Sequence, residues 1–127
     1  MMKYISALLS FLILTMSTAS AEDLDNNKIY NFYQPGCPHC QQALKDIKEN
    51  YPGLHMEMID VTASPYAHNM FVKCIRKFHI GRDDIGTPLF CMGDIYVMGW
   101  TTDQQLRFDV YVKDFLPPEY YQSQERE

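Results

Sequence analysis

The sequence lacks any cluster of lysine or arginine residues, and acidic residues outnumber basic ones by sixteen to eleven. With a formal net charge of −5, nucleic acid and anionic membrane surfaces are poor partners. Internal repeats and a recognisable linker are also missing. The 127 residues therefore predict one small domain with a modest core.

Patterns typical of metal sites are equally scarce. The histidines at 55, 68 and 79 lie far apart, without the spacing of metal ligands. The sequence contains a single C-x-x-C, whereas a four-cysteine zinc site normally uses two such pairs. We therefore expect no bound metal, and the chemistry inferred below requires no bound cofactor.

The main apolar run is too short to span a membrane. It covers residues 5–16 with three hydroxyl residues inside it, whereas a spanning helix needs roughly 20 apolar residues. Lys3 precedes the run, and small residues (A-S-A, 19–21) follow it before the chain turns acidic. This order is typical of a cleavable export signal. We predict that residues 1–21 are removed after Ala21 and that the protein is periplasmic; the alternative is an uncleaved anchor.

The first half of the remaining chain predicts a strand, a tight loop, a helix and a second strand. Residues 28–33 alternate and are rich in aromatic and β-branched side chains, as in a strand. The Q-P-G sequence at 34–36 breaks the strand, and Pro38 suits the first turn of a helix that ends near residue 50. Residues 54–61 alternate again and predict the second strand.

The second half predicts a helix, a hairpin and another helix. Residues 65–78 show the clearest amphipathic helical pattern in the chain. Residues 88–92 and 95–98 predict two short strands joined by a Gly93–Asp94 turn. Residues 102–115 begin with a capping box, T-D-Q-Q, and predict a helix, although their alternation also fits a strand.

The predicted order is β-α-β-α-β-β-α. The first strand–helix–strand unit implies a parallel pair of strands, and the closing hairpin implies an antiparallel pair. We therefore expect an α/β domain over residues 22–118, with a mixed four-stranded sheet and helices on both faces. Residues 119–127 are predicted to be a loose polar tail.

A C-x-x-C pair lies at the first strand–helix junction. Cys37 would lie at the helix N-terminus, where unpaired N–H groups and the helix dipole lower the pKa of a thiol below roughly 8.5. Cys40 would lie one turn inside and be less exposed. Disulfide exchange needs an ionised thiol and a partner within bridging distance. We predict that Cys37 attacks and Cys40 resolves; an inert disulfide and half a zinc site are the alternatives.

Pro38 and His39 separate the two cysteines. A protonated His39 would add positive charge beside Cys37 and favour its thiolate, since histidine titrates in the relevant pH range. The alternative is an exposed loop histidine with little electrostatic effect.

Cys74 and Cys91 are a second possible pair. Cys74 lies on the apolar stripe of the second predicted helix and Cys91 lies on a predicted central strand, so both are expected to point inward. We predict a structural disulfide, because an oxidising compartment favours it. The alternative is two buried free thiols that behave as small hydrophobic side chains.

Two segments resemble the glutaredoxins. Residues 32–40, F-Y-Q-P-G-C-P-H-C, resemble that family's active-site segment, Y-S-K-P-G-C-P-Y-C. Residues 87–90, T-P-L-F, followed by Gly93 and Gly99, resemble its T-V-P-x-V-F…G…G-G stretch. The similarity covers most of residues 28–110 and includes the order of the elements. It implies a thioredoxin-like fold of the glutaredoxin type.

The resemblance also implies roles for residues outside the C-x-x-C. Pro88 would follow a cis peptide bond and face the Cys37 sulfur. The loop that ends in Thr87 would offer its backbone to an extended substrate segment. The Pro-His dipeptide is the one found in the periplasmic oxidase DsbA, although that enzyme's inserted helical domain has no counterpart here.

Two departures from the glutaredoxin pattern argue against glutathione binding. Gln34 replaces the lysine that would pair with a glutathione carboxylate, and Trp100 replaces the second glycine of the family's pair. Trp100 would then be either an exposed apolar contact for protein substrates or a packed core residue. Thr102 and Asp103 do match the family's polar pair.

The sequence thus predicts an exported thiol–disulfide oxidoreductase for cysteine-containing exported proteins, recycled by a membrane redox partner. A low pKa for Cys37 and the Pro-His dipeptide favour oxidation, whereas a threonine before Pro88 resembles family members that reduce or isomerise disulfides. The alternatives are a glutathione-linked reductase of the glutaredoxin type and a non-catalytic thioredoxin-fold subunit of a secretion or conjugation system.

Overall fold

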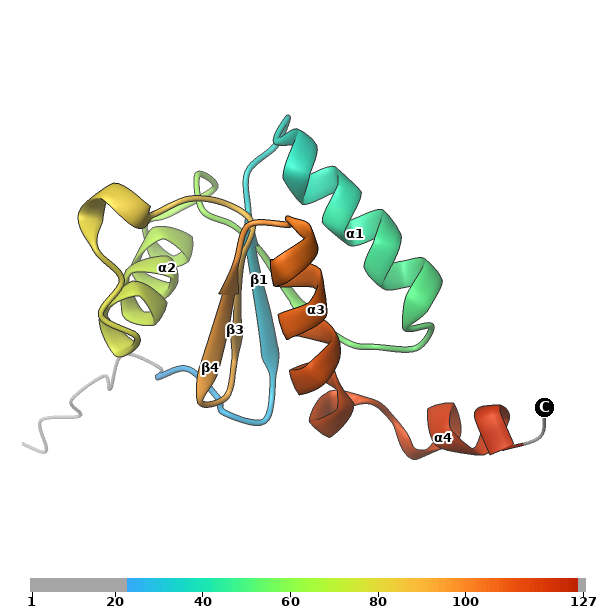
Figure 1. Ribbon diagram of the computed structural model, residues 1–127. Coiled ribbons are helices and arrows are strands. Elements are labelled where there is room, and N and C mark those ends of the chain that lie inside the picture. The colour runs from blue at the N-terminus through green and yellow to red at the C-terminus, as the bar shows by residue number, and fades with distance from the viewer. Residues whose placement is uncertain (1–22, 126–127) are drawn as a thin grey trace, which may run out of the picture.

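A computed structural model of the protein describes residues 23–125. The elements, shown in Figure 1, are β1 (Ile29–Tyr33), α1 (Pro38–Asn50), β2 (Glu57–Asp60), α2 (Pro65–Lys77), a 3₁₀ turn (Arg82–Asp84), β3 (Leu89–Met92), β4 (Ile95–Met98), α3 (Thr102–Tyr111), a second 3₁₀ segment (Val112–Phe115) and α4 (Pro118–Glu125). The export signal predicted for residues 1–21 lies outside this description. Within the described part, no helix is both long enough and apolar enough to cross a bilayer.

The strands form one mixed sheet in the order β2-β1-β3-β4. β1 and β2 are parallel, because α1 connects them as a crossover. β3 runs antiparallel to β1 and to β4. In Figure 1, α1 and α3 cover one face of the sheet and α2 covers the other. The predicted β-α-β-α-β-β-α order is therefore confirmed, and the topology is that of a thioredoxin-like fold of the glutaredoxin type.

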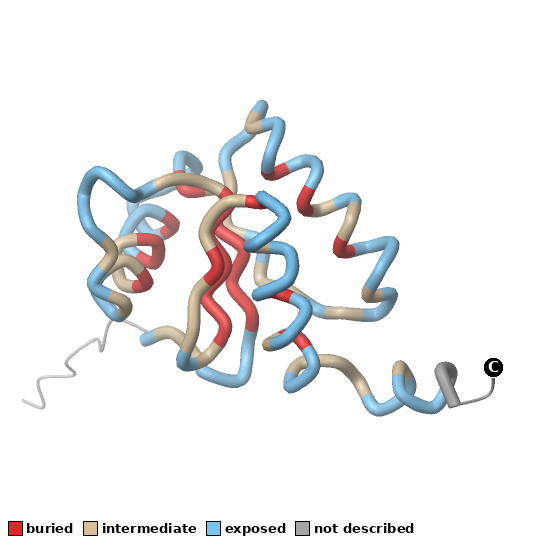
Figure 2. Tube along the Cα trace, viewed as in Figure 1, coloured by how far each residue is buried: buried red, intermediate tan, exposed pale blue. Residues whose placement is uncertain are grey.

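The sheet divides the core into two layers of apolar side chains. Phe90, Val97 and Phe108 pack with Ile47 of α1 on one face. Phe32, Leu89, Met70 and Cys74 are among the side chains that pack between the sheet and α2 on the other face. Figure 2 shows the central strands buried along their length. Because each fully buried side chain of this size contributes about 1.5–3 kcal/mol, β1 and β3 are firmly held where their ends carry the site.

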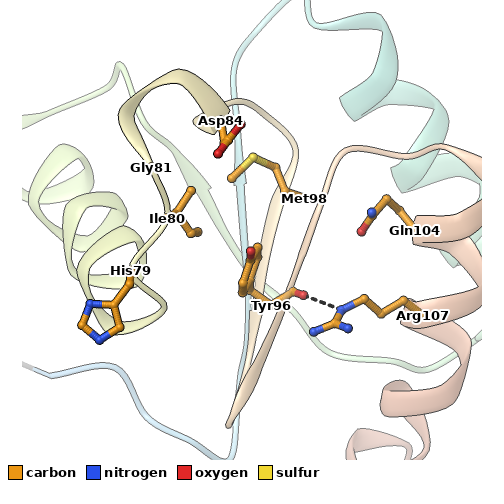
Figure 3. A pocket seen from close by; sticks show the side chains of 8 residues that line it. All are labelled: His79, Ile80, Gly81, Asp84, Tyr96, Met98, Gln104 and Arg107. Carbon is orange, nitrogen blue, oxygen red and sulfur yellow. Dashed lines mark hydrogen bonds between the residues drawn. The ribbon is translucent and has the colours of Figure 1, made fainter.

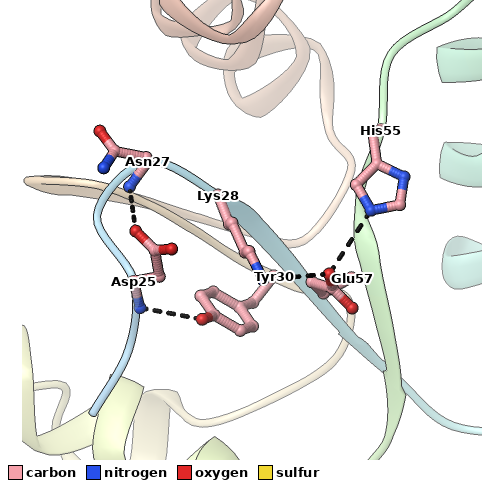
Figure 4. Close-up of polar contacts among 6 residues, drawn as sticks. All are labelled: Asp25, Asn27, Lys28, Tyr30, His55 and Glu57. Atoms are coloured by element: carbon pink, nitrogen blue, oxygen red, sulfur yellow. Dashed lines mark hydrogen bonds and ion pairs between the residues drawn. The ribbon is translucent and has the colours of Figure 1, made fainter.

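Polar contacts fix the chain where it enters β1, as Figure 4 shows. The backbone N–H of Asp25 donates to the Tyr30 hydroxyl at 2.8 Å, and that of Asn27 donates to the Asp25 carboxylate at 2.9 Å. Lys28 pairs with Glu57 across β1 and β2 at 3.5 Å. Since both side chains of this ion pair are exposed, its contribution is about 0–1 kcal/mol. These contacts hold the start of β1, at the opposite end of the strand from the C-x-x-C.

Two secondary-structure predictions need correction. The second strand is Glu57–Asp60 and is shorter than the predicted 54–61. Residues 119–127 were predicted to be a loose tail, but α4 occupies most of them. Pro118 begins this helix, where a proline is pre-organised for helical φ, and the Tyr121 hydroxyl donates to the carbonyl of Lys113 at 2.6 Å.

Asn31 is a buried amide in the middle of β1, with 1% of its surface exposed. By strand alternation it shares the α1 face with Ile29. Its Nδ2 donates to the sulfur of Met58 at 3.5 Å. Its Oδ1 has no hydrogen-bond partner among the described residues. Leaving a buried acceptor unpaired costs about 1–3 kcal/mol.

We expect Asn31→Leu to raise the free energy of unfolding by about 1 kcal/mol, because it removes the unpaired oxygen at nearly constant volume. Urea denaturation of the variant and the parent protein measures the difference. Asn69→Leu, at an exposed position of α2, is the matched control and should change stability by less than about 0.5 kcal/mol. A clear loss of stability in Asn31→Leu alone would contradict this account of the amide.

Candidate functional site

Cys37 and Cys40 form a disulfide at the N-terminus of α1, with their Cα atoms 5.2 Å apart. Cys37 is the N-cap residue: its backbone is extended, and its sulfur accepts a hydrogen bond from the N–H of Cys40 at 3.2 Å. Pro38 occupies the first helical position, where its missing N–H leaves no intrahelical bond unmade. Gly36, with φ of +77°, turns the chain sharply from β1 into this cap.

The two sulfur-bearing residues differ in exposure. Cys37 is partly exposed at the tip of the loop, whereas Cys40 is only 5% exposed. The sequence predicts this difference from the position of each cysteine in the helix. Pro38 and His39, between them, are both exposed. An incoming sulfur can therefore reach Cys37 more readily than Cys40.

The segment before β3 lies against the Cys37 sulfur. The Thr87–Pro88 peptide bond is cis, as the glutaredoxin resemblance implies. The Thr87 hydroxyl oxygen lies 3.6 Å from Cys37 Sγ and the Thr87 carbonyl oxygen lies 3.8 Å from it. The carbonyl of buried Pro88 accepts a hydrogen bond from the N–H of Gly99 at 2.8 Å. The fold thus joins a hydroxyl donor to a sulfur fifty residues away in sequence.

Trp100 belongs to the core and is only 8% exposed. Its indole N–H donates to the Asp46 carboxylate of α1 at 2.9 Å. Its ring contacts those of Phe90 and Phe108, with centroids 5.6 and 5.4 Å away. The prediction of an exposed substrate contact at Trp100 was wrong, and the packed alternative is correct. Through its hydrogen bond to Asp46, Trp100 instead connects the turn between β4 and α3 to helix α1.

Cys74 and Cys91 are joined as a disulfide between α2 and β3, with Cα atoms 6.3 Å apart. Their exposed fractions are 0% and 3%, so neither sulfur is accessible to a protein partner in the folded state. This bond lies on the α2 face of the sheet. It holds β3, the strand that follows Thr87 and Pro88.

A pocket that no sequence pattern predicted borders Cys40. Its volume is about 290 Å³, and its walls include Tyr33, Gly36, Cys40, Leu44 and Met58. We call it the Cys40 pocket. Met58 projects from β2, and the exposure of this large apolar side chain, 41%, is unusual for a strand of the sheet. Strand alternation alone did not show which face Met58 would occupy.

A larger pocket lies between the α2–β3 connection, β4 and α3, as Figure 3 shows. Its volume is about 410 Å³, and none of the cysteines lines it. Arg107 Nε donates to the carbonyl of Tyr96 at 2.9 Å. This contact covers part of the free edge of β4, which would otherwise be open to pairing with another strand.

Over residues 23–125, no three His, Cys, Asp or Glu side chains are grouped in a way that could hold a metal ion. No protein-family model matches the sequence, and no curated protein is detectably similar to it. Among solved structures, a mutant of the thioredoxin-like protein BC3987 matches with a TM-score of 0.49 and 23% identity, over 66% of this chain and 96% of that one.

A second solved structure, buckwheat glutaredoxin in complex with glutathione, matches with a TM-score of 0.49 and 13% identity, over 68% of this chain and 74% of that one. The thioredoxin-like topology itself is given by the strand order β2-β1-β3-β4 of this chain, and the C-x-x-C pair at the start of α1 is a disulfide. The chemistry of the site is argued from the residues of this chain alone.

The Thr87 hydroxyl is placed to donate to a Cys37 thiolate. In the reduced protein we expect Thr87→Val to raise the pKa of the Cys37 thiol by about 0.5–1, because a donor to the charged form is lost. Thr87→Ser, which keeps the hydroxyl, is the matched control and should stay close to the parent value. The measurement is the pH dependence of Cys37 alkylation. Equal pKa values in Thr87→Val and the parent would contradict the role of the hydroxyl.

Proposed function

We propose that this protein is an exported thiol–disulfide oxidoreductase that acts on cysteine-containing proteins through Cys37 and Cys40. The observation that carries the proposal is the Cys37 sulfur at the N-cap of α1, accessible from outside and accepting the N–H of Cys40 at 3.2 Å. A thiolate at this place is stabilised by unpaired N–H groups and by the helix dipole. The pKa of Cys37 should therefore lie below the roughly 8.5 of an ordinary thiol.

In the oxidising direction, a substrate thiolate attacks the sulfur of Cys37 in the Cys37–Cys40 disulfide. The bond between the two cysteines breaks, Cys40 leaves as a thiolate and takes up a proton, and a mixed disulfide forms at Cys37. A second substrate thiolate then attacks the substrate sulfur of that mixed disulfide, and Cys37 leaves as the stabilised thiolate. Two electrons pass from the substrate to the protein.

In the reducing direction the same steps run backwards. The Cys37 thiolate attacks a substrate disulfide, and the thiolate of Cys40 then attacks Cys37 to release the reduced substrate. A stabilised Cys37 thiolate favours the reduced protein and hence oxidation of the substrate. His39, exposed beside Cys37, would strengthen this preference when protonated. We therefore favour oxidation, with a membrane redox partner restoring the disulfide.

Protein substrates suit this surface better than glutathione does. Gln34, an exposed residue of the loop before Cys37, offers no positive charge to a glutathione carboxylate. Trp100 fills the place of the second glycine and packs inside the core. A purely docking role would not require an accessible sulfur at Cys37, so the exchange reaction is favoured over a non-catalytic subunit.

The Cys40→Ser variant tests the proposal. Without a resolving thiol, mixed disulfides through Cys37 should accumulate with exported proteins and dissociate on reduction. Non-reducing electrophoresis with mass spectrometry detects them. The Cys37→Ser variant is the control and should trap almost nothing, because its remaining site thiol, Cys40, is only 5% exposed. If the Cys40→Ser protein accumulates no mixed disulfide, the oxidoreductase proposal fails.

A further inference from the structure

The Cys40 pocket shares its wall with the redox pair. Cys40 lines it directly, and so does Gly36, the residue immediately before Cys37. The other walls come from the end of β1, the first turns of α1 and Met58 of β2. A polypeptide whose sulfur approaches Cys37 therefore passes beside this pocket.

The lining of the pocket carries no charge. None of its residues is Asp, Glu, Lys, Arg or His, and its polar side chains include the amides of Gln34 and Gln41. Anionic ligands would find no counter-charge there. An apolar group attached to a peptide backbone is the matching ligand, because glutamine amides can both donate to and accept from backbone groups.

The sheet order places the pocket and Thr87 on opposite sides of Cys37. β1 leads into Cys37 and is flanked by β2, which carries Met58, and by β3, which follows Thr87. A substrate segment lying against Thr87 on the β3 side can direct a side chain across Cys37 to the β2 side. The volume of about 290 Å³ is at the lower limit of ligand sites, which suits a single side chain.

We propose that the Cys40 pocket is a subsite for one uncharged apolar side chain next to the reacting cysteine of a protein substrate. This inference rests on the function proposed above and adds a selectivity to it. Burial of that side chain covers Met58, whose surface is 41% exposed in the free protein. Cysteines flanked by aliphatic or aromatic residues should therefore react faster than cysteines flanked by small polar residues.

Two dithiol peptides test the subsite. They are identical except that Leu or Ser flanks each cysteine, and each is mixed with protein whose Cys37–Cys40 disulfide is intact, so that the two peptide thiols become a disulfide as Cys37 and Cys40 become thiols. For the parent protein we expect the Leu peptide to react about tenfold faster, the effect of partly burying one leucine. Met58→Glu and Met58→Lys should both bring the ratio of the two rates close to one.

The charges of the two Met58 variants distinguish the subsite from an effect on the thiolate. Glutamate and lysine alter the ionisation of Cys37 in opposite directions, whereas both remove the apolar wall. Leu106→Glu, which changes an exposed apolar residue of α3 outside the pocket, is the matched control and should preserve the tenfold ratio. Urea denaturation checks that each variant is folded.

The outcomes separate the two proposals. If the parent protein reacts with both peptides at equal rates, or if the Met58 variants keep the preference, the subsite is overturned and the redox function stands. If the parent protein reacts with neither peptide, the proposed function fails and the subsite fails with it. A tenfold preference that both Met58 variants lose and Leu106→Glu retains supports the subsite.

Discussion

The hydrogen bond from the N–H of Cys40 to the sulfur of Cys37 is the contact on which the site depends. N-cap positions are usually filled by Ser, Thr, Asp or Asn, whose oxygens accept from the first turn of the helix. In this protein the sulfur of Cys37 is the N-cap acceptor. The unpaired N–H groups at the start of α1, which need an acceptor, therefore also stabilise a Cys37 thiolate. The two sulfurs differ because Cys37 lies outside the first turn and Cys40 lies within it. This one contact therefore links the start of α1 to the proposed direction of electron transfer.

The rest of the fold holds this contact in place from both faces of the sheet. Trp100 packs in the core and binds Asp46, which fixes α1 from the side of α3. On the other face, the disulfide between Cys74 and Cys91 joins α2 to β3. Since β3 follows Pro88 directly, that disulfide also steadies Thr87 against Cys37. The cysteine pair proposed to react is thus supported by a second disulfide, Cys74–Cys91, which is buried in the core.

Local signals in the sequence predicted much of this arrangement. Pro38 after a strand and a tight loop identified the start of α1, and the helical periodicity of residues 65–78 identified α2. The contact between Thr87 and Cys37 needed the glutaredoxin resemblance, because fifty residues separate them and no local rule relates them. The same holds for the cis bond at Pro88.

Other features of the structure depend on tertiary packing, which local sequence patterns do not reveal. Trp100 follows a glycine in a turn, so only the neighbouring rings of the core determine that it points inward. The Cys40 pocket depends on Met58, which lies in a short strand whose register with β1 is set by the sheet. Helix α4 was missed because its residues show little apolar periodicity.

The most direct test is the pKa of the Cys37 thiol, measured by thiolate absorbance with site-specific alkylation after selective reduction of the Cys37–Cys40 disulfide. Stabilisation at the N-terminus of α1 predicts that the pKa of the Cys37 thiol lies below that of an ordinary cysteine and below that of Cys40. A Cys37 pKa at or above the roughly 8.5 of an unperturbed cysteine would contradict the account, because the helix would then give the sulfur no advantage as an anion.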